Sequence, residues 1–63
     1  MNNKIKQITE EDVIPFIVDN KTVFRADLDR LKMCDLSSKS VANIRKDFGN
    51  ANYVYFVVED END

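Results

Sequence analysis

The segment Tyr53–Val58, with the sequence YVYFVV, places the strongest constraint on how this chain folds. All six residues are aromatic or β-branched, which is the composition that favours a β-strand. Polar and apolar residues do not alternate along the segment, as they do in a strand with one face in water. We therefore expect a strand that is paired centrally or covered on both faces. At the edge of a sheet, it would pair with another chain.

The length of the chain limits the size of its core. Sixty-three residues make one small domain, 1–63, and a domain of this size buries only about 60% of the surface that its unfolded chain exposes. The composition, 43% hydrophobic and 33% charged, is that of a globular protein. We expect residues 1–4 and 60–63 to be frayed. Because one small core supplies little buried area, we expect binding to a partner or to a second copy.

The N-terminal part of the chain predicts a short helix or turn followed by a β-hairpin. Residues Thr9–Asp12, TEED, match a capping box, but Pro15 limits any helix to one or two turns. Residues 9–14 are therefore a short helix or a turn that leads into a strand. The apolar runs Phe16–Val18 and Thr22–Phe24 lie on either side of turn-forming residues, which predicts a β-hairpin.

A helical period follows the hairpin. Leu28, Leu31 and Cys34 recur at three-residue steps, with charged residues between them. This spacing places the three apolar side chains on one face of a helix. We therefore predict a first helix over about residues 26–34.

A second helix is predicted over about residues 38–48. Ser37 or Ser38 can cap its first turn, and Gly49 can end it in the left-handed conformation. Three apolar residues fall on one face: Val41, Ile44 and Phe48. The fold class predicted from these segments is α+β, with a short N-terminal hairpin or strand, two adjacent helices and a C-terminal strand at about 53–58. With Thr22–Phe24 paired to that strand, the arrangement is a reduced winged helix-turn-helix.

The pair of helices predicts a small DNA-binding regulator. Residues 21–46 carry seven basic and three acidic side chains, a net charge of +4 in a chain whose total is −3. In a helix-turn-helix the second helix enters the major groove, where Asn43 can pair with adenine and Lys39 with guanine. Asp35 in the turn and the bulky Leu31 depart from the usual pattern. The residues expected to contact DNA are Ser38, Lys39, Asn43, Arg45, Lys46 and Arg25.

The alternative prediction is a protein-binding inhibitor or adaptor, of the kind that phages and mobile elements encode. Aromatic side chains act as anchors in protein interfaces, and charges steer association. The C-terminal strand and the acidic tail supply both kinds of side chain. The contact residues would be Tyr53, Tyr55, Phe56, Glu59, Asp60 and Glu61. The same strand can also pair with a second copy, so a homodimer is an expected form.

Other functions are not expected. The chain contains no histidine, its one cysteine, Cys34, lies on an apolar face of the predicted helix, and Gly49 is its only glycine. We therefore predict no enzyme activity, no small-molecule substrate, no cofactor and no metal. No segment approaches the roughly 20 apolar residues of a membrane span. A single cysteine fits a reducing compartment, so we expect no membrane association and a cytoplasmic location.

Overall fold

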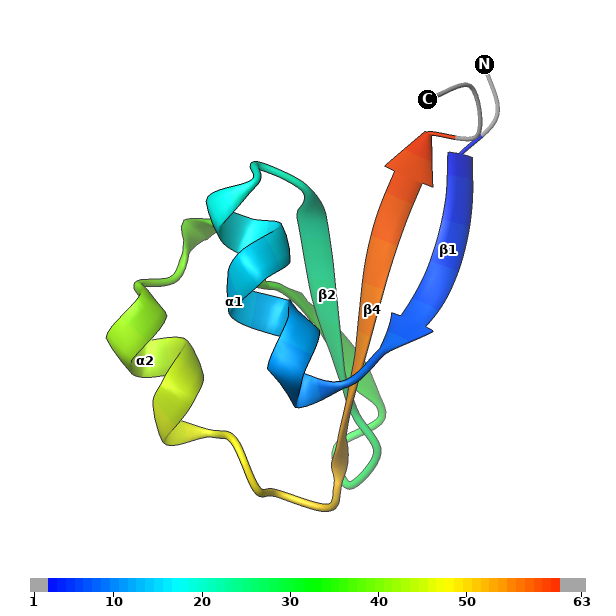
Figure 1. Ribbon diagram of the computed structural model, residues 1–63. Helices are drawn as coiled ribbons and strands as arrows, with labels where there is room; N and C mark the ends of the chain where they lie inside the picture. The colour runs from blue at the N-terminus through cyan, green and yellow to red at the C-terminus, as the bar shows by residue number, and fades with distance from the viewer. Residues whose placement is uncertain (1–2, 61–63) are drawn as a thin grey trace.

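The computed structural model describes residues 3–60, which form four strands, two α-helices and one short 3-10 helix (Figure 1). In chain order these are β1 (Asn3–Ile8), α1 (Glu10–Val18), β2 (Thr22–Asp27), β3 (Lys32–Asp35), the 3-10 helix η1 (Leu36–Ser38), α2 (Val41–Lys46) and β4 (Tyr53–Asp60). The strands make one antiparallel sheet in the order β1-β4-β2-β3. The α+β class predicted from the sequence is confirmed.

Strand β4 lies inside the sheet, as its composition predicts. It pairs with β1 on one side and with β2 on the other, so that Tyr55 lies opposite both Ile8 and Arg25. Residues 3, 4 and 60, which we expected to be frayed, lie in the paired strands β1 and β4. Glu61 and the two residues after it lie outside the described residues.

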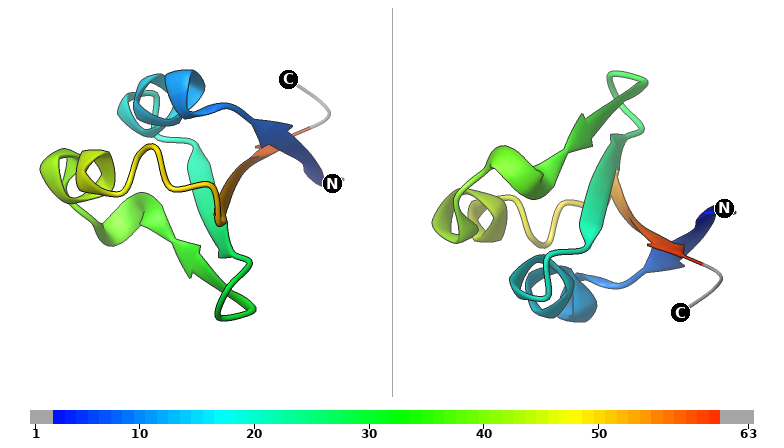
Figure 2. Two further views of the ribbon diagram at one scale, coloured as in Figure 1. Left: turned by 90° about the horizontal axis from the view of Figure 1, so that it is seen from below. Right: turned by 90° about the horizontal axis from the view of Figure 1, so that it is seen from above.

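Both α-helices cover the same face of the sheet (Figure 2). The core between the helices and the sheet contains seven buried side chains from six of the seven elements: Ile8, Val13, Val23, Leu36, Ile44, Tyr55 and Val57. Within β4, Tyr55 and Val57 are two residues apart, so they point to the same, covered face. Phe56 lies between them and, like Val54 and Val58, points to the other face, on which Figure 2 shows no helix.

The hairpin predicted for Phe16–Val18 and Thr22–Phe24 is wrong, because residues 10–18 form helix α1. Val13 is fully buried, and Phe16 and Ile17 pack against the core. This packing outweighs the local effect of Pro15, which lies inside the helix. Thr9 occupies the N-cap position but its side chain makes no capping hydrogen bond, so the expected capping box does not form.

The helix predicted over 26–34 is also wrong: the segment is a β-hairpin made by the end of β2 and by β3. The carboxylate of Asp27 accepts hydrogen bonds from the backbone N–H groups of Asp29 and Arg30, both at 3.0 Å, and so closes the turn. Leu31 adopts a left-handed conformation, with φ of 54°. The apolar spacing therefore marks no buried helix face, and the winged helix-turn-helix does not form.

The second predicted helix is confirmed in a shorter form. Helix α2 covers only Val41–Lys46, and its N-cap is Ser40, whose hydroxyl accepts from the backbone N–H of Asn43 at 3.2 Å. Ser37 and Ser38, the expected caps, lie in η1 instead. Gly49 has a φ of 88° and lies beyond the end of the helix.

Tyr55 is the largest side chain of the core and is incompletely satisfied. Its ring meets that of Phe48 edge to face, with the ring centroids 5.8 Å apart. Its hydroxyl is buried and has no hydrogen-bond partner within residues 3–60. Burial raises the pKa of Tyr55, and the nearby carboxylate of Glu10 raises it further.

These observations predict the effect of Tyr55→Phe. The substitution removes an unsatisfied buried hydroxyl, so we expect the free energy of unfolding at pH 7 to rise by about 1 kcal/mol in urea titrations. A raised pKa in the folded state stabilises the protein fully below the ordinary tyrosine value of about 10, and this contribution is lost as the pH rises further. Tyr55→Phe should therefore show a shallower loss of stability above pH 10, whereas Tyr53→Phe should keep the steep one. Equal slopes for the two variants would contradict the assignment.

Candidate functional site

The structure distributes the predicted DNA contacts over three places. Asn43, Arg45 and Lys46 lie exposed on α2, and Ser38 and Lys39 lie exposed just before it. Arg25 lies on β2. Helix α2 has no helical partner from residues 26–34, so the geometry that places a recognition helix in a groove is missing.

The side chain of Arg25 is turned inward and is only 11% exposed. Its guanidinium lies over the ring of Tyr53, 4.2 Å from the centroid, and Nη1 donates to Oδ2 of Asp47 at 2.7 Å. Asp47 directly follows α2. Arg25 therefore joins the end of α2 to the sheet.

The predicted protein contacts are divided between the two faces of β4. Tyr53 and Tyr55 point to the covered face, and both contact the core. Phe56 points to the opposite face. Glu59 forms an ion pair with Lys6 of the neighbouring strand, at 3.5 Å. These residues therefore do not form one contact surface, and Glu61 lies outside the described residues.

The face of the sheet opposite the helices carries a continuous apolar surface, which we call the open face. Strand pairing places Phe24 opposite Phe56, Ala26 opposite Val54, Ile5 opposite Val58, and Met33 opposite Ala26. Side chains that are directly opposite in antiparallel strands point to the same side. The apolar members of the open face are Ile5, Phe24, Ala26, Met33, Val54, Phe56 and Val58.

These side chains do not contribute to the core. The partly buried apolar residues that pack against the core come from α1, β3, β4 and the segment after α2, and none of them is Phe24, Phe56 or Val58. Ile5 is 69% exposed and Met33 57% exposed. The open face is therefore apolar, but its side chains are not part of the core between the helices and the sheet.

The tip of the β2–β3 hairpin extends this surface. Ala26, Leu28, Leu31 and Met33 line a hollow of about 250 Å³. Leu31 is 87% exposed and holds its Cβ in a left-handed backbone conformation, which costs roughly 1–2 kcal/mol. Neither burial nor backbone preference accounts for leucine at this position. Leu31 therefore adds an exposed apolar side chain to the hairpin tip.

The charged residues of the open face are all acidic. At the open-face positions of the four strands within residues 3–60, the charged side chains are Asp35 on β3 and Asp60 at the end of β4. The backbone N–H of Ser37 donates to Oδ1 of Asp35 at 2.9 Å and lowers the pKa of that carboxyl group. Asp35 therefore stays charged at neutral pH.

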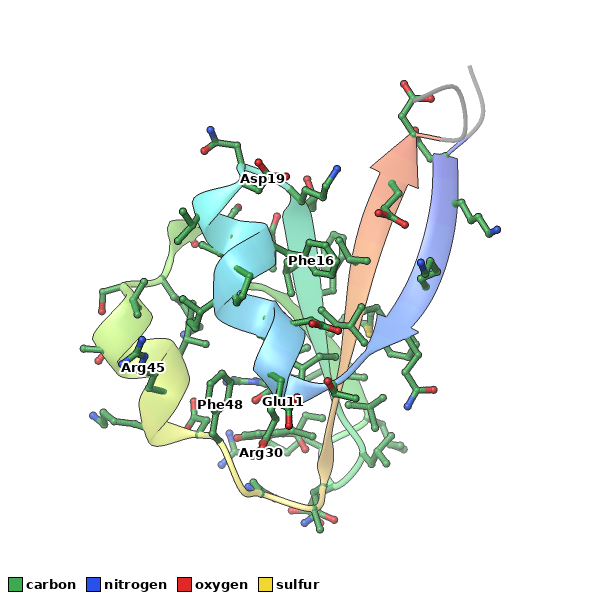
Figure 3. All side chains as sticks on the ribbon, in the orientation of Figure 1. Glu11, Phe16, Asp19, Arg30, Arg45 and Phe48 are labelled. Atoms are coloured by element: carbon green, nitrogen blue, oxygen red, sulfur yellow. The ribbon has the colours of Figure 1, made fainter. Side chains whose placement is uncertain are left out.

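A second apolar hollow, of about 750 Å³, lies on the other side of the molecule between α1 and α2. Ile14, Pro15, Val18 and Phe48 line it. Figure 3 shows Phe48 between the two helices, with Arg45 on one side and Glu11 on the other. The rim thus carries both signs of charge, and the ring of Phe48 contacts Tyr55 below it.

Comparison with protein-family models, curated proteins and solved structures gave no match for this chain. Within residues 3–60, no helix has the length and hydropathy needed to cross a membrane. In the same part of the chain, no three His, Cys, Asp or Glu side chains come together as they do around a metal ion.

The strained position of Leu31 predicts a difference between two truncations. Leu31→Gly should be more stable than Leu31→Ala by about 0.5–1 kcal/mol, because only alanine keeps a Cβ at this positive φ. Urea titration of both variants measures the difference. Equal midpoints would show that the turn is not strained. Since both variants empty the same side of the hollow, any loss of partner binding should be the same in both.

Proposed function

We propose that the chain is a small protein-binding domain, of the inhibitor or adaptor type, and that it binds its partner through the open face. The observation that supports this proposal is the apolar row of β4 on the side without helices, Val54, Phe56 and Val58, which continues onto β1, β2 and β3. Val54, Phe56 and Val58 are half-buried, and Ile5 and Met33 at the margins of the surface are exposed, so an apolar face is open to a partner.

The size of the open face supports a specific contact. Four strands about 4.8 Å apart and about five residues at 3.4 Å each give a footprint of roughly 300 Å². Apolar patches of this size on soluble proteins often mark interaction sites. The hollow beside Leu31 adds a recess that fits one apolar side chain of a partner. Interface anchors typically occupy such recesses near the centre of a contact.

The charges favour a different protein over a second copy. Asp35 and Asp60 are both negative, and no lysine or arginine occupies an open-face position of the four strands described. Two copies that met through this face would bring their Asp35 carboxylates together, with Lys32 at the margin of the hairpin hollow. The partner that fits has an apolar centre surrounded by lysine and arginine, which would also be attracted by the net charge of −3.

DNA binding through Ser38, Lys39, Asn43, Arg45, Lys46 and Arg25 stays a prediction from the sequence. Its support is the exposed basic side chains of α2, and the helix pair on which it was based is absent from residues 26–46. We also propose a reducing, cytoplasmic location, because Cys34 is free.

Photo-crosslinking identifies and tests the partner. A photoreactive phenylalanine analogue is placed at Ile5 or Met33 on the open face, and at Val18 on α1 as a control. Val18 is as exposed as Ile5, at 72% against 69%, but belongs to the helix side. We expect one protein to be crosslinked in cells from both open-face positions and not from Val18.

Titration of that protein with purified variants completes the test. We expect Met33→Ser and Ile5→Ser each to weaken binding about tenfold or more, and Val18→Ser to leave it unchanged. Asp35→Asn keeps the turn acceptor, so it should weaken binding mainly at low salt. If the photoreactive variants crosslink to a second copy and the protein sediments as a dimer, the open face serves self-association and not binding to a different protein. Equal effects of the Met33 and Val18 variants would exclude the open face.

A further inference from the structure

A cluster of basic residues lines a cavity beside β3, whose lining comes mostly from the covered face of the sheet and includes Met33 of the open face. Arg25 of β2, Arg30 and Lys32 of the hairpin, and Lys39 beside η1 surround a space of about 310 Å³ together with Tyr53. Four of the nine lysine and arginine residues of an acidic chain thus converge on one cavity. We infer that this cavity binds a small phosphate compound.

The positive charge of the cavity is only partly neutralised. Asp47 holds Arg25 at 2.7 Å, and Asp27 lies 3.9 Å from Nε of Arg30. The side chains of Lys32 and Lys39 form no ion pair within residues 3–60. The cavity and the carboxylates beside it therefore keep an excess of two positive charges. Holding like charges together is unfavourable unless an anion joins them.

Part of the cavity is already fixed in place. Arg25 is clamped between the ring of Tyr53 and the carboxylate of Asp47, so its guanidinium has little freedom to lose on binding. The turn that carries Arg30 is closed by two hydrogen bonds to Asp27. Strand pairing places Lys32 directly opposite Asp27. The Arg25 side chain and the backbone of the turn are therefore pre-formed, whereas the exposed side chains of Arg30, Lys32 and Lys39 become ordered only when a ligand binds.

The chemistry of these side chains selects phosphate. Guanidinium groups match the geometry of phosphate oxygens, and lysine adds a compact charge with three donors. The volume is at the lower end of the range for small-molecule sites, roughly 300–1,000 Å³. It fits a free diphosphate or the phosphate end of a nucleotide. The backbone of a nucleic acid carries the same group, so the test must separate these two sources.

An amide-shift NMR titration with inorganic pyrophosphate at low salt tests the site. We expect shifts at residues 25–39 and at Tyr53, without shifts on α2. Lys32→Gln and Lys39→Gln should each weaken binding about tenfold, as the loss of one charge-assisted hydrogen bond predicts. Lys46→Gln, which removes an exposed charge of α2 outside the cavity, is the matched control and should bind as the natural chain does. Unchanged dispersion of the amide spectrum confirms that each variant is folded.

Two results would overturn the inference. If Lys32→Gln and Lys39→Gln bind pyrophosphate as Lys46→Gln does, the cavity is not the site. If a single-stranded DNA dodecamer binds much more tightly than pyrophosphate and also shifts Asn43–Lys46, the ligand is a nucleic acid strand and not a small phosphate compound. Lys32 and Met33 line both this cavity and the hollow at the hairpin tip, whereas Lys39 lines only the cavity, so Lys39→Gln is the variant that tests the phosphate site separately from the proposed protein contact.

Discussion

The hydrogen bonding of β4 on both of its edges is the constraint on which the rest of the structure depends. β1 and β2 do not pair with each other, and each meets the sheet through β4. With this strand in the middle, Tyr55 and Val57 supply the centre of the core, and α1 crosses from the edge strand β1 to β2 above them. Because every second residue of β4 points away from the helices, the apolar composition that makes it a good central strand also makes the open face.

The elements that the sequence predicts well are those decided locally. The run of aromatic and β-branched residues at 53–58 predicts a central strand, and α2 lies inside its predicted range because a serine cap and Gly49 delimit it. The hairpin of β2 and β3 is hidden in the sequence, because Leu28, Leu31 and Cys34 have helical spacing and two inward positions of β2 are the polar residues Arg25 and Asp27. The turn N–H groups bond the carboxylate of Asp27, and Asp47 pairs with Nη1 of Arg25, whereas Nε of Arg25 has no hydrogen-bond partner within residues 3–60. Partners distant in the sequence are not visible in a local pattern.

The candidate sites illustrate the same limit. The lack of alternation between polar and apolar residues in YVYFVV is visible in the sequence. Whether one or both faces of the strand are covered depends on where the helices lie. The apolar residues Phe24 and Ala26 on the neighbouring strand were the available signal, and they acquire meaning only with the register of β2 against β4. Arg25 and Lys39, both singled out as phosphate or base contacts on a helix pair, do come together, but in a cavity beside a hairpin. The residue types predict contact with phosphate, whereas the positions of the strands decide which of these residues lie close together.

The pairing of β1 with β4 also determines when the binding surface comes into existence. Asn3 lies opposite Asp60, and within residues 3–60 β1 pairs with no strand other than β4. A chain that emerges from the ribosome N-terminus first carries β1, α1, β2 and β3 before the strand that joins them. The apolar side chains of β1 and β2 therefore become parts of one sheet face only when β4 inserts between these two strands. Contacts of such long sequence separation form slowly compared with local ones. A partner that recognises the whole face consequently distinguishes a chain in which β4 has inserted from one in which it has not.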